Sequence, residues 1–166
     1  MSMLSRWLQN LTTTHFALRR HFPPATLSAI DAAISASERE HRAEIRCAIE
    51  TALPLGELLR GATSTARAAE VFAGLRVWDT AENNGVLVYV LLAERSIEIV
   101  ADRGFEGRVA VTEWEAICRD MEAAFRGGRY EAGTLAALER IGALARRHFP
   151  GGGEGRNELP DRPVLL

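Results

Sequence analysis

An unbroken apolar run at residues 86–92 constrains the fold of this chain more than any other feature. The run is rich in β-branched residues and too short for a buried helix, so it predicts a central strand covered on both faces. Residues 94–95 form a predicted tight turn, and residues 97–101 then alternate between apolar and other side chains. This alternation is typical of an antiparallel partner strand and completes a β-hairpin.

A hairpin returns the chain to the point where it began, and this brings two polar loops together. Asp102 and Arg103 follow the second strand, while Asn83 and Asn84 precede the first. Because antiparallel partners pair end to end, residues 102–104 are expected beside residues 83–85. Two loops dense in oxygen and charge then meet at one end of a rigid sheet.

A further strand is predicted at residues 45–50, where apolar and other side chains alternate. A helix from about residue 64 to residue 76 connects it to the central strand. A strand–helix–strand order favours a parallel pair with a right-handed crossover. Both strands then start at the same end of the sheet, so Glu44 is expected to join the cluster that contains Asp102.

The remaining segments are predicted to be helical and to surround the sheet. A Thr-x-x-Glu-like capping box is expected at residues 112–115, and a glycine pair follows at residues 127–128. The predicted fold class is α/β, a small mixed β-sheet flanked by helices, with an N-terminal helical extension. The predicted domains are an extension at residues 1–36, an α/β domain at 37–149, and a Gly-rich linker with an extended tail at 150–166.

Composition narrows the class of function. With 166 residues, of which 47% are hydrophobic, the chain fits one globular domain with a sizeable core. No basic patch interleaved with aromatic residues is present, which argues against a nucleic-acid partner. No apolar run approaches the length of a transmembrane segment or a secretory signal. Cys47 and Cys118 lack metal-site spacing and suit free thiols in a reducing compartment, so a cytoplasmic location is predicted.

Both ends of the chain leave alternatives open. The first thirty residues contain no acid, and Leu4, Trp7, Leu8 and Leu11 form one apolar stripe. The stripe predicts either a helix that caps the domain or a segment that contacts a membrane, as a transit peptide or an interfacial helix does. The tail from Leu159 to Leu166 is extended by its prolines and is expected to dock on its own domain or on a protein partner.

The oxygen-bearing side chains at the strand starts predict a divalent-cation site. Ca²⁺ and Mg²⁺ prefer several oxygen ligands from carboxylates, amides and carbonyls. The candidate ligands share one end of the predicted sheet or the loops leading to it: Glu44, Asn83, Asn84, Asp102, Glu38 and Asp79. The alternative interpretation is ordinary turn chemistry, in which Asn84-Gly85 makes the turn and Asp102 accepts backbone N–H groups.

Three ordered motifs resemble the TPM domain family. They are Asn84-Gly85-Val86-Leu87, then the run from Asp102 to Gly107, then the run from Phe125 to Gly133. The family includes a thylakoid-lumen protein implicated in photosystem II repair and assigned acid phosphatase activity. The resemblance implies a compact α/β sandwich, a divalent-cation site that prefers calcium, and phosphomonoester hydrolysis.

Three functions are consistent with these features. The first is an accessory module that binds a divalent cation, Ca²⁺ or Mg²⁺, or a partner at the strand-start end. The second is a metal-assisted phosphomonoester hydrolase, in which Arg103 or a metal neutralises phosphoryl charge and Asp102 or an activated water is the nucleophile. The third is a protein- or membrane-interaction module that acts through the C-terminal tail or the N-terminal helix.

Overall fold

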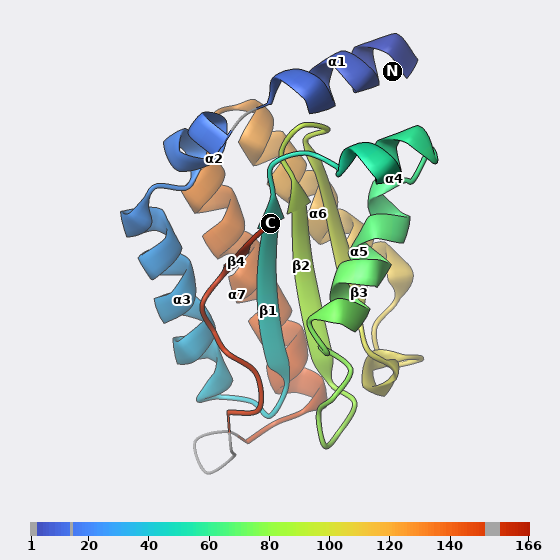
Figure 1. Cartoon of the computed structure of the whole chain (residues 1–166). Coiled ribbons are helices and arrows are strands. Elements are labelled where there is room, and N and C mark those ends of the chain that lie inside the picture. The colour runs from blue at the N-terminus through green and yellow to red at the C-terminus, as the bar shows by residue number, and fades with distance from the viewer. Residues whose placement is uncertain (1–2, 14, 152–156) are drawn as a thin grey trace.

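The computed structural model describes residues 3–13, 15–151 and 157–166 (Figure 1). It has the predicted α/β class, with a small mixed sheet between helices and an N-terminal helix. The helices are α1 (Met3–Thr12), α2 (His15–His21), α3 (Pro24–Glu38), α4 (Leu55–Leu59), α5 (Ser64–Gly74), the 3₁₀ turn η1 (Arg103–Phe105), α6 (Val111–Arg126) and α7 (Tyr130–His148). The strands are β1 (Glu44–Glu50), β2 (Gly85–Leu91), β3 (Ser96–Ala101) and β4 (Val164–Leu165).

The sheet has the order β3-β2-β1-β4 and contains the predicted hairpin and crossover. Strand β2 pairs with β3 in antiparallel fashion, with Val86 opposite Ala101. Strand β1 pairs with β2 in parallel, with Glu44 opposite Gly85, and helix α5 lies in the crossover between them. The prediction that β1 and β2 start at the same end of the sheet is therefore confirmed.

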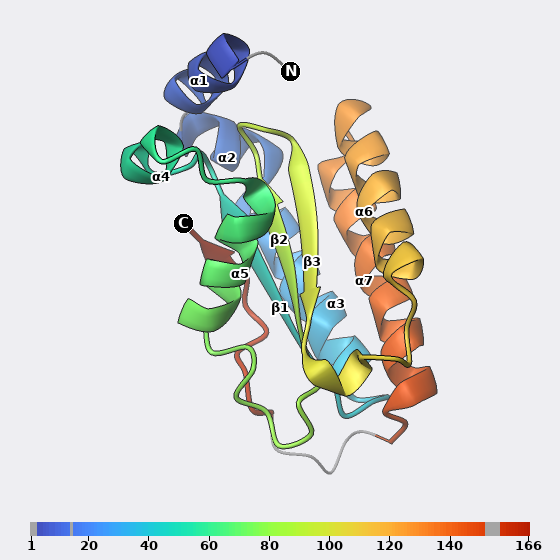
Figure 2. The same cartoon turned by 90° about the vertical axis from the view of Figure 1, so that its right-hand side faces the viewer.

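Helices cover both faces of the sheet, as Figure 2 shows. Helices α3, α6 and α7 pack on one face, where Ile45, Cys47 and Ile49 of β1 lie in a single apolar cluster with Ile30 and Leu138. Helix α5 covers the other face. All seven residues of β1 and all seven of β2 are buried. The predicted burial of the central strand on both faces is confirmed.

Gly85 starts strand β2 at a point where no side chain fits. A Cβ atom at this position would lie 1.9 Å from the backbone carbonyl oxygen of Val77. The turn that follows helix α5 therefore packs directly on the backbone of the central strand. This close approach is the physical reason for glycine at the head of β2.

The C-terminal tail docks on its own domain. Val164 and Leu165 form β4, which pairs in parallel with Ala48 and Ile49 of β1 (Figure 1). Leu159 is buried, and its backbone N–H donates to the Glu44 carboxylate at 3.0 Å. The tail was expected to dock either on its own domain or on a protein partner, and in the structure it docks on its own domain. Most of the predicted Gly-rich linker lies outside the described residues.

Two local expectations are corrected. Helix α6 begins at Val111 rather than at a Thr112 cap: Ala110 is the N-cap, and Glu113 accepts its backbone N–H at 3.1 Å. Helix α1 caps one end of the domain through only one residue of its apolar stripe: Trp7 packs on the apolar cluster, whereas Leu4, Leu8 and Leu11 are exposed. Helix α3 ends at Glu38, and the predicted division of the chain near residue 36 stays a prediction. No helix in the described part of the chain is long and apolar enough to cross a membrane.

Candidate functional site

The two polar loops at the open end of the hairpin lie side by side, and we call residues 83–85 and 102–104 the two-loop site. The backbone N–H of Asp102 donates to the carbonyl of Gly85 at 2.9 Å, and that of Gly104 donates to the carbonyl of Asn83 at 2.8 Å. The Arg103 guanidinium also donates to Asn83 Oδ1 at 2.7 Å. This close approach of residues 102–104 to residues 83–85 was expected from the predicted hairpin.

The backbone is tightly packed at the two-loop site. Asn83 has a positive φ of 52°, which asparagine tolerates better than most residues. A Cβ atom at Gly104 would lie 2.4 Å from the carbonyl oxygen of Asn83 and 2.8 Å from that of Glu82. Backbone oxygens of the first loop therefore face the second loop at close range.

Two buried side-chain oxygens at the two-loop site have no hydrogen-bond partner among the described residues: Asn84 Oδ1 and Asp102 Oδ2. Asn84 is 1% exposed, and its Nδ2 donates to the carbonyl of Arg42 at 2.7 Å. Asp102 Oδ1 accepts the backbone N–H of Arg103 at 2.8 Å. Buried polar atoms are almost always paired, so these two acceptors require a partner such as a cation or water.

Glu44 and Glu38 belong to a separate acidic group beneath the tail. Glu44 accepts the N–H of Leu159, and Glu38 accepts the N–H of Ile45 at 2.7 Å. Burial raises the pKa of Glu44, and burial with the nearby acids Glu44 and Asp161 raises the pKa of Glu38 to about 9. Because β1 and β3 lie on opposite sides of β2, Glu44 and Asp102 start from backbones roughly 10 Å apart. The structure thus places residues 83–85 beside residues 102–104, whereas the Glu44 carboxylate bonds to the C-terminal tail.

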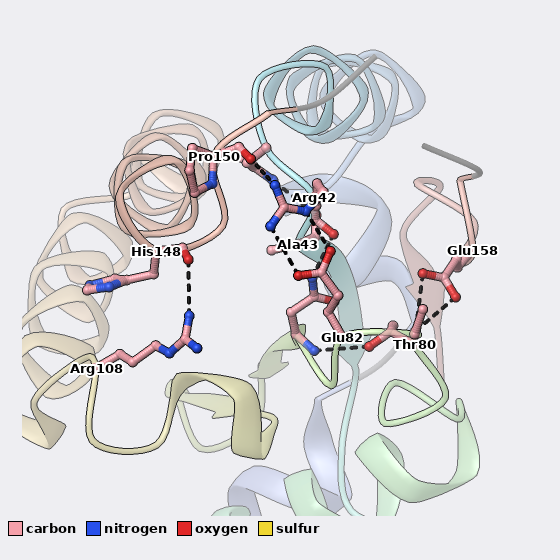
Figure 3. A network of polar contacts seen from close by, with 11 residues as sticks. Arg42, Ala43, Thr80, Glu82, Arg108, His148, Pro150 and Glu158 are labelled. Atoms are coloured by element: carbon pink, nitrogen blue, oxygen red, sulfur yellow. Dashed lines mark hydrogen bonds and ion pairs between the residues drawn. The ribbon is translucent and has the colours of Figure 1, made fainter. Parts of the chain in front are cut away.

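Asp79 lies outside both groups. Its carboxylate is about half exposed and pairs with Arg76 at 2.6 Å. Arg42, by contrast, was not among the predicted site residues although it links the surrounding loops (Figure 3). Its guanidinium donates to both oxygens of Glu82 and to the carbonyl of Pro150. The sequence gives no signal for the role of Arg42 beyond the charged segment before β1, because its partners lie 40 and 108 residues away in the chain.

A cleft of about 740 Å³ opens between β3 and α6 and reaches the two-loop site. Asp102 and Arg103 lie on its lining together with the apolar side chains of Ile99, Phe105 and Trp114. Trp114 packs edge-on against Phe105, with the ring centroids 5.5 Å apart. A ligand in this cleft would therefore contact an apolar wall and the charged pair at one end.

The atoms at the two-loop site that could ligate a metal are oxygens, and few of them carry a charge. Within residues 3–13, 15–151 and 157–166, no group of three or more His, Cys, Asp or Glu side chains is placed to hold a metal ion. The available oxygens are the Asp102 carboxylate, the Asn84 amide and neighbouring backbone carbonyls. Oxygens are the ligands that hard cations prefer, and the affinity of such sites rises with the number of charged ligands.

Comparison with known proteins gives a consistent result. A family model described as the TPM domain matches residues 19–144. The NMR structure of the BA42 protein from the psychrophilic bacterium Bizionia argentinensis is similar, with a TM-score of 0.71 and 25% sequence identity. That match covers 86% of this chain and 93% of the BA42 chain. None of the curated proteins compared matches the sequence.

Proposed function

We propose that this chain, which belongs to the TPM domain family, is an accessory module that binds a divalent cation at the two-loop site. The observation that carries the proposal is the pair of buried oxygens without a donor, Asn84 Oδ1 and Asp102 Oδ2. A carboxylate oxygen and an amide oxygen are the ligand types that Ca²⁺ and Mg²⁺ prefer, and these two flank the paired strands β2 and β3. A cation bound there would compensate the Asp102 charge.

Contacts around the two-loop site hold these oxygens in position. The contact between Arg103 and Asn83 holds the two loops together, and the bond from Asn84 Nδ2 to the Arg42 carbonyl leaves the Asn84 oxygen as the free end of its amide. Backbone carbonyls of Glu82 and Asn83 stand close to Gly104. With a single carboxylate in the set, we expect a dissociation constant on the order of 10⁻³ M, at the weak end of protein calcium sites.

Calcium titration followed by amide NMR tests this proposal. We expect chemical-shift changes at residues 83–85 and 102–104 that saturate in the millimolar range. Asp102→Asn removes the only charged ligand and should weaken binding at least about tenfold, since a hard cation depends on charged oxygen ligands. Asp79→Asn is the matched control, because it removes an equally charged but exposed side chain that pairs with Arg76.

Two outcomes would contradict the cation site. One is the absence of any shift at tens of millimolar calcium. The other is a set of shifts centred on Glu38, Glu44 and Asp161, which would assign binding to the acidic group beneath the tail instead.

The alternative of metal-assisted phosphomonoester hydrolysis rests on the cleft beside Asp102 and Arg103. A phosphoryl group there would meet the Arg103 guanidinium, although that side chain already donates to Asn83. Turnover of a generic phosphomonoester that disappears in Asp102→Ala would support this function. Equal turnover by the wild type and the variant would identify a contaminant. The activity and the predicted cytoplasmic location both stay predictions.

A further inference from the structure

Helix α1 turns its apolar side to solvent. Leu4, Leu8 and Leu11 are 85%, 64% and 64% exposed. Their spacing of four and three residues places them along one side of the helix, which we call the outer leucine face. Single exposed leucines are ordinary on protein surfaces. Three on the same side of one helix indicate a surface that contacts a partner or a membrane.

Polar contacts hold α1 in this orientation. Asn10 is 6% exposed, and its side chain donates to Glu94 at 3.0 Å and accepts the N–H of Leu53 at 2.9 Å. Arg6 donates to the same Glu94 carboxylate at 2.7 Å. The side of α1 that faces the domain therefore carries Arg6 and Asn10, together with Trp7, which packs against the apolar cluster on the α5 face of the sheet. Rotation of the helix to bury its leucines would break these buried contacts, which are costly to lose.

Unpaired positive charge lies at the same end of the molecule as the outer leucine face. Helix α2 carries Arg19 and Arg20, and the β2–β3 turn carries Arg95; all three are exposed and form no ion pair within the described residues. Arg20 and Arg95 lie near His21, whose pKa is lowered by partial burial first and by these two charges second. Helices α1 and α2 and this turn gather at the same end of the molecule in both views (Figures 1 and 2). No acid precedes Asp31 in the chain.

We propose that this end of the protein docks on an anionic lipid surface, with the outer leucine face in the interface and the three arginines at the headgroups. Interfacial helices of this kind combine a leucine-rich side with arginines that attract anionic lipids. A second copy of the chain fits less well, because pairing two such ends would bring the unpaired arginines of both copies together. The surface lies at the opposite end of the sheet from the two-loop site, so it is independent of the proposed cation site.

Sedimentation with lipid vesicles tests the proposal, using the full chain in EDTA to remove divalent cations. We expect binding to vesicles of phosphatidylcholine and phosphatidylserine, and little binding to phosphatidylcholine alone. Binding should weaken as salt rises, because ions screen the attraction between arginines and headgroups. Persistence of binding in EDTA separates this surface from the cation site.

Two double variants separate the apolar and the charged contributions. Leu8→Gln with Leu11→Gln should weaken the partition coefficient more than about tenfold, since two leucines no longer enter the interface. Arg19→Gln with Arg20→Gln should weaken it by roughly 25-fold, from about fivefold for each lost charge. Arg39→Gln with Arg147→Gln is the matched control: it makes the same charge change on exposed arginines at the other end of α3 and α7 and should leave binding unchanged.

Three results would overturn the proposal. The first is no sedimentation with anionic vesicles at low salt. The second is equal loss of binding in the control and in the Arg19 and Arg20 variant, which would show a nonspecific charge effect. The third is a dimer in solution that Leu8→Gln with Leu11→Gln converts to a monomer, which would assign the outer leucine face to a second copy. Each variant changes only exposed side chains, so an unchanged thermal midpoint is expected and checks that it folds.

Discussion

Glu50→Ala is expected to destabilise the protein by about 3–5 kcal/mol, the usual cost of removing one partner from a buried ion pair. Glu50 ends strand β1, and its side chain is only 4% exposed. It accepts two hydrogen bonds from the Arg67 guanidinium, at 3.0 and 2.9 Å, and a third from the hydroxyl of the fully buried Tyr89. Truncation leaves a largely buried positive charge and a buried hydroxyl without their acceptor.

The same arginine supplies the control for this measurement. Arg67 also pairs with Glu70 at 3.1 Å, but the Glu70 side chain is 52% exposed. Exposed pairs contribute little, so Glu70→Ala should cost less than about 1 kcal/mol. Urea unfolding of both variants gives the comparison. Equal destabilisation by the two substitutions would show that the β1 carboxylate is not the partner that Arg67 requires.

Local sequence patterns were sufficient to predict the centre of the fold. The apolar run of β2, the alternation in β3 and the helical spacing of α5 each follow from a short stretch of chain. A hairpin and a right-handed crossover then leave few arrangements. The same two connections explain why the approach of Asn83 to Arg103 was predictable, since register in a hairpin follows from its turn.

Polar partners distant in the sequence were not predictable. Arg46 and Glu50 alternate with apolar residues, a pattern that ordinarily indicates a strand with one solvated face. The structure buries both, because Glu50 meets Arg67, 17 residues away, and Arg46 donates to the carbonyl of Arg162, 116 residues away. No local signal marks such pairs.

The same limit applies to the N-terminal helix and to the candidate ligands. The leucine stripe of α1 left two orientations open, one facing the domain and one facing a membrane, and the observed one is held by the contact between Arg6 and Glu94, 88 residues apart. Glu44 was expected beside Asp102 from strand order alone. Its carboxylate instead accepts a backbone N–H from the tail, whose path depends on residues after α7.

Glu38→Gln is expected to stabilise the protein at neutral and alkaline pH. Burial, followed by the charges of Glu44 and Asp161, raises the pKa of Glu38 to about 9 from an ordinary value of 4.5. The carboxyl group is therefore protonated in the folded protein at pH 7. In that form one oxygen accepts the N–H of Ile45, and the hydroxyl donates to Asp161. Glutamine reproduces both bonds with its oxygen and its NH₂ group and carries no titrating proton.

The sign of the pH dependence follows from proton binding. A group whose pKa is raised on folding stabilises the folded state fully below about pH 4.5, and this stabilisation is lost as the pH rises toward and through about 9. The wild type should therefore lose stability between these values relative to Glu38→Gln. At pH 8 we expect the variant to be more stable by an amount on the order of 3 kcal/mol, after allowance for partial solvation of the group.

Urea unfolding at several pH values between 5 and 9 measures this difference. The two stability curves should lie close together at pH 5 and diverge steadily above it. Glu106→Gln removes the same charge from an exposed position and should run parallel to the wild type throughout. A Glu38→Gln curve that stays below the wild type with an unchanged slope would mean that Glu38 is ionised in the fold. The acidic group beneath the tail would then be held by charge that its neighbours compensate, rather than by a shared proton between Glu38 and Asp161.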